Sequence, residues 1–375
     1  MRTAIIADWL PTFGGAEHVV AAMHRLFSAA PIFTTVARKD RLLDLASADI
    51  RLSALQIPFS ILGTHTVLLP WMPRAMERMD LRNYDLILSS SHAVGKGIIP
   101  PSNAVHICYC HTPVRYGWEM EDAYLSDFRI PKLLQSPIRK VLMRLRQWDM
   151  TSAARVDMFI ANSRTTQERI RRFYGRESTV IHPPVNEQFF TGRIASSRPQ
   201  DRNYFLALGR LVPYKRFDLL IEVANRLHLP LKIAGSGSDF KRLQKLAGPT
   251  VQMLGHVPES EISNLYTHAR AFLFPQIEDA GVAALEAQAS GTPVIALGQG
   301  GALDTVMHGI TGILFPEQSV RSIENALQEW EAVTWDSTAI RRHAEQFREE
   351  NFSKKLQQSI QEALCNFSRS VESAS

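Results

Sequence analysis

Short apolar runs alternate with amphipathic stretches along almost the whole chain, and this alternation constrains the fold more than any other feature. Continuous apolar runs indicate buried strands, whereas apolar positions spaced three or four residues apart indicate helices. The first half predicts strands at Thr3–Ala7, Leu86–Leu88, Val105–Cys108 and Met158–Ala161, and helices at about His18–Ala29, Lys39–Leu45, Leu133–Arg155 and Thr165–Phe173. Strands joined by helices form parallel sheets that are covered on both faces.

The pattern restarts after Gly192–Arg202, a polar stretch with Pro and Ser that we interpret as a linker. The second half predicts strands at Tyr204–Leu208, Leu231–Ala234, Val251–Leu254, Ala271–Phe274, Pro293–Ala296 and Ile313–Phe315, and helices at Asp218–Leu227, Phe240–Leu246 and Val282–Ser290. We therefore expect an α/β protein with two doubly wound, Rossmann-like domains, residues 1–190 and 203–350, that face a cleft. Residues 351–375 should form a C-terminal helix that packs back on the N-terminal domain, because apolar side chains follow one side of it.

Length, charge and cysteine content narrow the class of protein. The chain has 375 residues, about twice a typical domain, which favours two domains. Its net charge of +5 is too small to indicate a nucleic-acid binder. Three cysteines cannot form a disulfide framework, and we find neither a signal peptide nor an apolar run long enough to cross a membrane. We expect a cytoplasmic protein that meets a membrane, if at all, at its inner surface.

Two charged segments of the second half follow predicted strands, where open α/β sheets bind ligands. Arg210 and Lys215 lie on one short loop and together could neutralise a diphosphate, although a solvated basic loop is the alternative. Glu278 and Glu286 flank Gly281, and their carboxylates could accept hydrogen bonds from the vicinal hydroxyls of a sugar or a ribose. From the residues alone, two such glutamates are more often ordinary surface groups.

The first half offers two weaker signals. Gly14 and Gly15 join the first strand to the first helix, where a helix N-terminus favours an anion; a plain tight turn explains them equally well. His111 follows the strand Val105–Cys108 and could bind a polar ligand or act as a base, whereas a structural histidine is the more common case. No D-x-D pair or zinc-type histidine spacing occurs, so we expect no metal and no cofactor.

Two other glycine loops, Gly235–Gly237 and Gly298–Gly301, also follow predicted strands. The first resembles the start of a dinucleotide fingerprint, but Phe240 stands where the third glycine should be, so a structural turn is favoured. The second is a candidate loop beside a phosphate or sugar, with a turn as the alternative. A nicotinamide-dependent oxidoreductase is therefore weakly supported.

In chain order, these features resemble glycosyltransferase family 4: Gly14–Gly15, His111 before Thr-Pro, Arg210 with Lys215, and Glu278 with Glu286 around Gly281. The resemblance covers nearly the whole chain and implies a GT-B fold and retaining transfer of a sugar from a nucleotide diphospho-sugar without a bound metal. It implies that Gly14 and Gly15 contact the donor diphosphate through the backbone, and that Arg210 and Lys215 bind the same diphosphate. His111 and Glu278 correspond to groups beside the transferred sugar, Glu286 to the ribose ligand, and Gly281 and Val282 to amides near sugar and phosphate.

Three segments, Ser89–Gly97, Cys110–Tyr116 and Val180–Val185, resemble bacterial mannosyltransferases of polysaccharide and O-antigen assembly, including lipopolysaccharide. This resemblance implies GDP-mannose as the donor and a glycan, lipid-linked in many such enzymes, as the acceptor. Asp279-Ala280 departs from the family, which commonly has a bulkier residue before the glycine, and this leaves the donor sugar open. A UDP-sugar-dependent glucosyl- or galactosyltransferase of the same family is the alternative.

Residues 129–155 carry seven cations against a single acid, Asp149, and apolar residues recur there at helical spacing. A basic amphipathic helix suits an anionic membrane surface, with Arg139, Lys140, Arg144 and Arg146 on the headgroups and Trp148 at the interface. An ordinary domain helix with its arginine side in water explains the same pattern equally well. A membrane-surface binding protein without enzymatic activity is the third class of function, but it would not need glutamates and cations at strand ends.

Overall fold

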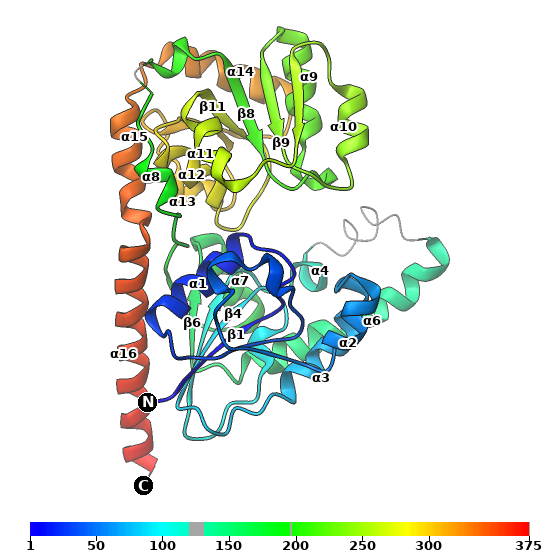
Figure 1. Ribbon diagram of the computed structural model, residues 1–375, viewed down its shortest axis with the longest axis vertical. Helices are drawn as coiled ribbons and strands as arrows, with labels where there is room; N and C mark the ends of the chain where they lie inside the picture. Colours follow the sequence, from blue (N-terminus) through cyan, green and yellow to red (C-terminus); the bar gives the residue numbers. More distant parts are fainter. Residues whose placement is uncertain (120–130, 196, 375) are drawn as a thin grey trace. The chain divides into compact units, whose positions relative to one another are not determined.

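The computed structural model describes residues 1–119, 131–195 and 197–374 (Figure 1). The chain divides into two compact units: unit 1, Met1–Pro184 with Glu350–Ser375, and unit 2, Val185–Glu349. Each unit contains one parallel sheet with helices on both faces, which confirms the predicted doubly wound α/β fold.

Unit 1 is built on a seven-stranded parallel sheet in the order β3-β2-β1-β4-β5-β6-β7. The strands are β1 (Thr3–Ala7), β2 (Ile32–Thr34), β3 (Ile50–Leu52), β4 (Leu86–Ser91), β5 (Val105–Cys110), β6 (Met158–Ala161) and β7 (Ser178–Val180). The central strands β4 and β5 are buried along their whole length, as expected of parallel strands covered on both sides. Their carboxyl ends, with that of β1, form one edge of the sheet that carries polar side chains.

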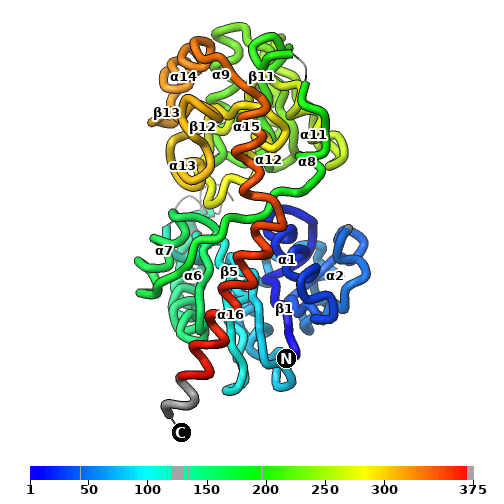
Figure 2. The backbone as a smooth tube through the Cα atoms, turned by 90° about the vertical axis from the view of Figure 1, so that its left-hand side faces the viewer, coloured from blue at the N-terminus to red at the C-terminus, as the bar shows by residue number. Residues whose placement is uncertain are grey.

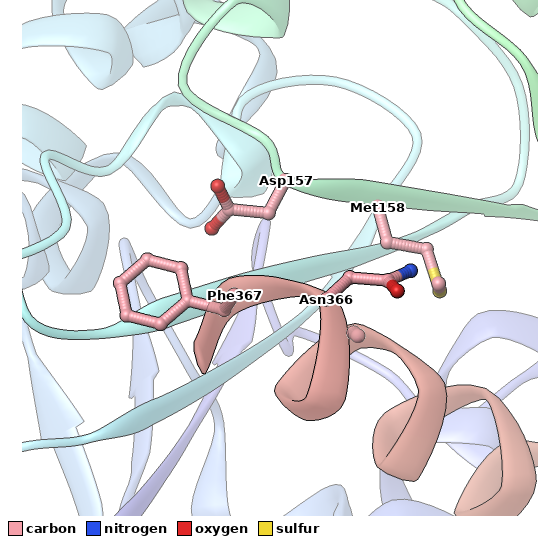
Figure 3. Close-up of a pocket in the computed structure, with 5 residues that line it drawn as sticks. Asp157, Met158, Asn366 and Phe367 are labelled. Atoms are coloured by element: carbon pink, nitrogen blue, oxygen red, sulfur yellow. The ribbon is translucent and has the colours of Figure 1, made fainter. Parts of the chain in front are cut away.

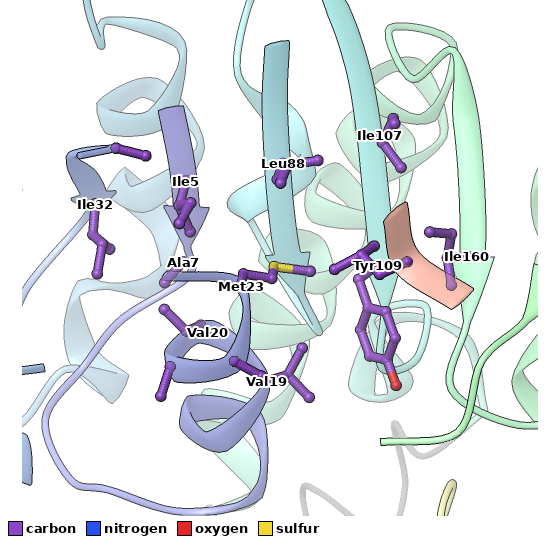
Figure 4. Packing of buried hydrophobic residues seen from close by; sticks show 14 of the residues in the cluster. Ile5, Ala7, Val19, Val20, Met23, Ile32, Leu88, Ile107, Tyr109 and Ile160 are labelled. Carbon is purple, nitrogen blue, oxygen red and sulfur yellow. The ribbon is translucent and has the colours of Figure 1, made fainter. Parts of the chain in front are cut away.

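Two helical layers cover this sheet. One face packs against α1 (Gly15–Leu26) and α16 (Glu349–Ala374) (Figure 2). Val19 and Met23 of α1 lie in the core on this face (Figure 4), which also contains Phe352 of α16. The other face packs against α2 (Gln56–Leu62), η3 (Thr66–Trp71), α3 (Met72–Glu77) and α6 (Lys132–Ala153), which share a second core with Phe59 and Leu145. In the described part of unit 1, the remaining helices are η1 (Lys39–Arg41), η2 (Leu43–Leu45), η4 (Gly95–Gly97), α4 (Arg115–Trp118) and α7 (Arg164–Tyr174).

Unit 2 repeats this architecture with a six-stranded parallel sheet in the order β10-β9-β8-β11-β12-β13. Its strands are β8 (Tyr204–Leu208), β9 (Leu231–Ala234), β10 (Val251–Gly255), β11 (Ala269–Phe274), β12 (Val294–Leu297) and β13 (Gly312–Phe315). Its helices are α8 (Gln188–Thr191), η5 (Pro199–Asp201), η6 (Pro213–Lys215), α9 (Phe217–Leu227), α10 (Phe240–Leu246), α11 (Glu259–Thr267), α12 (Val282–Ala289), α13 (Ala302–Thr305), α14 (Val320–Ala332), α15 (Ser337–Ala344) and η7 (Glu345–Phe347).

The stretch that we interpreted as a linker is packed on unit 2. The guanidinium of Arg202 is buried and donates to the carbonyl of Ala269 at 3.0 Å and to the hydroxyl of Thr292 at 3.1 Å. Upstream, Phe189 and Phe190 of α8 are buried in the core of unit 2. The division between the units therefore falls after Pro184 rather than between residues 190 and 203.

Sequence periodicity missed three strands, misjudged one helix and did not locate α2, α3, α11, α14 and α15. The strands β2, β3 and β7 have three residues each, too short to stand out as apolar runs. The predicted helix Lys39–Leu45 is instead two single 3₁₀ turns. Leu42 and Leu45 are buried there, but the charged run Lys39–Arg41 before them and Asp44 between them leave no continuous apolar stripe for an α-helix to bury.

Candidate active site

An ion pair joins two loops at the carboxyl edge of the sheet of unit 2. Lys215 lies in η6, after β8, and Glu278 lies in the loop between β11 and α12. The Lys215 Nζ is 2.8 Å from the Glu278 Oε1, and the two side chains are 14% and 25% exposed. The parallel order of the sheet, in which β8 and β11 are neighbours, brings the two loops together. A partly exposed cation and carboxylate thus stand side by side where α/β sheets bind ligands.

Arg210 belongs to the same edge. Its side chain is exposed, and its Nη2 lies 3.4 Å from the hydroxyl of Tyr214 within the same loop. This contact is at the limit of hydrogen-bond length, so the guanidinium can be reoriented toward a ligand at little cost.

Glycines of the Gly235–Gly237 loop support the segment that carries Arg210. A Cβ on Gly235 would collide with the carbonyl of Gly209, and one on Gly237 would collide with the backbone of Leu211. The Leu211 N–H donates to the Ser236 carbonyl at 2.8 Å, which ties the two loops together. The expected structural turn is therefore what these glycines provide.

The Gly298–Gly301 loop supports the segment that carries Glu278 in the same way. The Gly301 N–H donates to the Glu278 carbonyl at 2.8 Å. A Cβ on Gly300 would collide with that same carbonyl, and one on Gly301 would lie 2.6 Å from the backbone of Ala280. Two backbones approach each other more closely here than any residue with a Cβ allows, so this loop fixes the position of Glu278.

Helix α12 begins directly after the loop that carries Glu278. Gly281 precedes it with φ of +66°, and Val282 is its first residue, so the amide end of the helix points toward the edge that carries Glu278. Glu286 lies further along α12, against α11, where the Tyr266 hydroxyl donates to its Oε2 at 3.2 Å. Burial raises the pKa of Glu286 to about 8, although the hydrogen bond from Tyr266 opposes the shift.

Three polar residues gather at the carboxyl edge of the sheet of unit 1: Asp8 after β1, His92 after β4 and His111 after β5. Asp8 is buried and accepts backbone N–H bonds from residues 92–95, while the His92 Nδ1 lies 2.9 Å from its Oδ2. Burial raises the pKa of Asp8, but His92 and these N–H groups outweigh that effect and hold the pKa well below its usual range. Asp8 was not among the predicted site residues; an acid directly after the first buried strand was the available signal.

His111 is held by the neighbouring strand. Its Nε2 lies 2.8 Å from the Ser90 hydroxyl, and its ring is 6.2 Å from that of His92. Burial lowers the pKa of His111 to about 3, with His92 contributing. His111 is therefore neutral at physiological pH and can donate or accept a hydrogen bond without carrying charge.

The segment Ser89–Gly97 contributes polar side chains that contact these residues and α6. Ser89, Ser90 and Ser91 bond in turn to His106, His111 and Asp8. Lys96, which is 2% exposed, forms a buried ion pair with Asp149 of α6. This segment therefore connects the polar edge of the sheet to α6.

Gly14 and Gly15 lie at the same edge of unit 1, at the start of α1. A Cβ on Gly15 would have no heavy atom within 4 Å, so the described backbone at this position is open to a ligand. Glu17, in the first turn of α1, is 9% exposed, and burial raises its pKa.

Helix α6 carries the residues that we expected at a membrane. Arg139, Lys140, Arg144 and Arg146 are exposed, and the Arg146 guanidinium lies 4.2 Å from the centroid of the Trp118 ring. Arg129 lies outside the described residues. The prediction for Trp148 is wrong: its indole donates to the Glu77 carboxylate at 2.9 Å and covers Gly97, where a Cβ would collide with the ring. Trp148 fills the space between α6 and α3 and does not face a membrane.

A small pocket lies elsewhere in unit 1, between the start of β6 and α16 (Figure 3). It is lined by Asp157, Met158, Ala363, Asn366 and Phe367. Asp157 already accepts a hydrogen bond from the His106 N–H at 2.7 Å. Since this pocket stands at the amino end of β6, it is separate from the edge that carries His111. Within residues 1–119, 131–195 and 197–374, no group of three or more His, Cys, Asp or Glu side chains is placed to hold a metal ion.

Comparison with known families assigns both halves of the chain. Residues 13–189 match the family model described as Glycosyltransferase Family 4, and residues 190–349 match the model described as Glycosyl transferases group 1. Each half of the chain thus matches a glycosyltransferase family model. With two parallel-sheet α/β units, the chain has the GT-B fold that the sequence resemblance implied.

The curated relatives that the chain matches carry names with different substrates. The chain is 27% identical over 248 residues to a D-inositol 3-phosphate glycosyltransferase of Thermobispora bispora, a match that covers 57% of this chain and 58% of the relative. It is 28% identical over 216 residues to a GDP-mannose-dependent alpha-(1-6)-phosphatidylinositol monomannoside mannosyltransferase of Mycolicibacterium smegmatis, which covers 48% and 56%. The chain thus matches about half the length of these relatives.

Solved structures agree on the fold. Anabaena HepE in complex with UDP and glucose superposes with a TM-score of 0.69 at 17% identity, over 96% of this chain and 99% of that chain. The apo lipopolysaccharide outer core galactosyltransferase WaaB superposes with a TM-score of 0.66 at 18% identity, over 96% and 99%. In the part of the chain that the structure describes, no helix has both the length and the apolar character required to span a bilayer.

Proposed function

We propose that this glycosyltransferase moves mannose from GDP-mannose to a lipid-linked glycan with retention of configuration, as a step in the assembly of a cell-surface polysaccharide. The observation that carries the proposal is the Lys215–Glu278 pair, 2.8 Å apart at the carboxyl edge of the sheet of unit 2. A nucleotide-sugar donor presents a diphosphate and sugar hydroxyls next to each other, and this pair presents a cation and a carboxylate in the same way. The donor is proposed from a similarity: the chain is 28% identical to the M. smegmatis mannosyltransferase, whose name specifies GDP-mannose.

The chemistry requires that negative charge on the departing diphosphate be stabilised as the bond between the sugar carbon and the phosphate oxygen breaks. We assign this role to the ammonium of Lys215, the guanidinium of Arg210 and the amide end of α12 at Gly281 and Val282. For unit 1, we assign the open backbone at Gly15, next to Gly14, to contact with a donor phosphate. The leaving phosphate accepts the proton of the acceptor hydroxyl as that hydroxyl attacks from the same face, so no enzyme nucleophile is required.

The two carboxyl groups orient the donor. Glu278 accepts hydrogen bonds from hydroxyls of the transferred sugar. Glu286, which keeps its proton at neutral pH because its pKa is about 8, exchanges hydrogen bonds with the ribose hydroxyls. His111 stays neutral because its pKa is about 3, so its part is a hydrogen bond to the sugar and not a charge. Since the Tyr266 hydroxyl already donates to Glu286, one carboxylate oxygen is held in place before the nucleotide arrives.

The acceptor is placed at the inner face of the plasma membrane, which makes the protein a peripheral enzyme of the cytoplasm. Arg139, Lys140, Arg144 and Arg146 supply the attraction to anionic lipid, since each cation near such a surface adds about 1 kcal/mol. Changing these four residues to Glu is expected to weaken binding to anionic vesicles. If the wild type ignores such vesicles at low salt, the acceptor is soluble.

The two cations stand where other glycosyltransferases use a metal, so we propose that transfer needs no metal and no cofactor. Activity is therefore expected to survive EDTA. Complete loss in chelator that Mg²⁺ or Mn²⁺ restores would contradict this part of the proposal.

A ligand panel tests the donor. GDP and GDP-mannose are expected to raise the melting temperature of the protein, and NAD is expected to leave it unchanged. Stabilisation by UDP and UDP-glucose alone would replace the mannosyltransferase with the UDP-sugar-dependent alternative. Stabilisation by NAD alone would favour an oxidoreductase.

A further inference from the structure

Large apolar side chains are exposed on one short stretch of unit 1. In α2, Ile57 is 71% exposed, Ile61 is 80% exposed and Leu62 is 54% exposed. In η3, which follows directly, Val67 is 51% exposed and Trp71 is 56% exposed. We call these five residues the α2–η3 patch. Single exposed apolar residues are common on protein surfaces, but five within one short helix–turn segment indicate an interaction site.

The segment is apolar on both of its sides. Phe59, Leu68 and Leu69 of the same elements are buried in the core that covers the sheet of unit 1. Ile57 and Ile61 are four residues apart in α2 and so lie on one side of that helix, while Phe59 points into the core. A helix whose core side is already satisfied gains nothing inside this unit from isoleucines on its outer side.

The charges around this patch indicate a negatively charged partner. No acidic residue occurs between Asp49 and Glu77, and Arg74, just beyond the patch, is exposed. Helix α6 packs in the same layer, since Leu145 shares the core that contains Phe59 and Leu68. The exposed residues of α6 include Lys140 and Arg144. Met143, which stands between them in the sequence, is 58% exposed, and Met150, further along the helix, is 51% exposed.

We propose that the α2–η3 patch inserts into the interfacial region of an anionic lipid bilayer, while the basic residues of α6 lie on the headgroups. A bilayer offers apolar volume and negative charge over one continuous surface, which matches an acid-free apolar patch next to a basic helix in the same layer. The indole of Trp71 suits the headgroup level, where an amphipathic ring has both apolar and polar surroundings. This inference deepens the proposed function and rests on it in one respect: membrane binding would bring the enzyme to a lipid-linked acceptor. It does not depend on which donor the enzyme uses.

The test measures vesicle binding of the full chain directly. Wild type, Ile61→Ser with Trp71→Ser, and a control, Leu303→Ser with Ile310→Ser, are sedimented with vesicles of phosphatidylcholine that contain phosphatidylglycerol. The control residues in unit 2 are 59% and 53% exposed, so they match the patch residues in exposure and polarity change. The patch variant is expected to bind at least about 10-fold more weakly than the wild type, and the control to bind like the wild type.

A second measurement locates the contact. Brominated lipids are expected to quench part of the tryptophan fluorescence of the wild type, and Trp71→Phe is expected to remove that part while the melting temperature is unchanged. Equal binding of patch variant and wild type, or quenching that persists in Trp71→Phe, overturns the inference. Failure of the wild type to bind vesicles overturns the inference too. If the wild type then self-associates and the patch variant does not, the patch is a protein interface. Vesicle binding that needs the patch, without sugar transfer from any donor, leaves the inference standing and removes the proposed function instead.

Discussion

Lys215 and Glu278 lie 2.8 Å apart, from Nζ to Oε1, although they follow different strands of the sheet of unit 2. The pair is partly exposed, and the two glycine loops after β9 and β12 brace the two segments that carry it. Its geometry is therefore set before any ligand binds, which is what electrostatic stabilisation of a transition state requires.

Lys215→Ala and Glu278→Ala are each expected to reduce sugar transfer by roughly 30- to 1000-fold, since each removes about 2–4 kcal/mol of contact with the donor. Initial rates with saturating acceptor measure this effect. Arg226→Ala is the matched control, because Arg226 forms an ion pair of similar length, 3.3 Å, with Glu324 in the same unit. Half of the wild-type rate in either active-site variant would remove that residue from the catalytic assignment.

Gly300→Ala is expected to lower sugar transfer at least about 10-fold, because its Cβ would collide with the carbonyl of Glu278 and displace that loop. Gly309→Ala serves as the control. Both glycines have positive φ, +66° and +75°, so both variants carry a similar backbone strain of about 1–2 kcal/mol. Only Gly300 has a close neighbour, whereas an added Cβ at Gly309 meets nothing within 4 Å. Equal activity of the two variants would show that the loop does not position Glu278.

Glu286 should make the stability of unit 2 depend on pH. Burial raises its pKa from 4.5 to about 8, so the folded state keeps a proton that the unfolded state loses between these values. The contribution of Glu286 to the stability of the folded state is therefore fully present below about pH 4.5 and is lost as the pH rises through 8. Glu286→Gln should melt at a higher temperature than the wild type near pH 8 and show a smaller difference near pH 5. A difference that does not change with pH would contradict the assigned burial.

Asp8 should make stability depend on pH in the opposite direction. Its pKa is held well below the usual value of 3.8, so its contribution to stability is present above that pH and is lost as the pH falls below it. Asp8→Asn is expected to cost roughly 2–5 kcal/mol at neutral pH, because an amide replaces a carboxylate that accepts several N–H bonds. Denaturant unfolding measures this cost. Asp44→Asn, at a carboxylate that is 50% exposed, is expected to have almost no effect.

The sequence predicts the parts of this protein that follow from periodicity and from position along a strand. Strand ends located Lys215 and Glu278 correctly in the fold, because the loops after neighbouring parallel strands must lie at one edge. Periodicity could not show that Ile61 faces solvent or that Trp148 is packed on Gly97, since an apolar residue has the same pattern in both settings. The role of Asp8 depends on backbone N–H groups of residues 92–95, far away in the sequence, and no local pattern reports such contacts.

Transfer of radiolabelled mannose tests the central claim most directly. The full chain is incubated with labelled GDP-mannose and a lipid extract that carries undecorated lipid-linked glycans, and the label is followed in the lipid fraction. We predict that label moves into that fraction as GDP is released in equal amount, and that Glu278→Ala abolishes both. Label that stays on the nucleotide in every extract, with no binding of GDP or UDP to the wild-type protein, would contradict the claim.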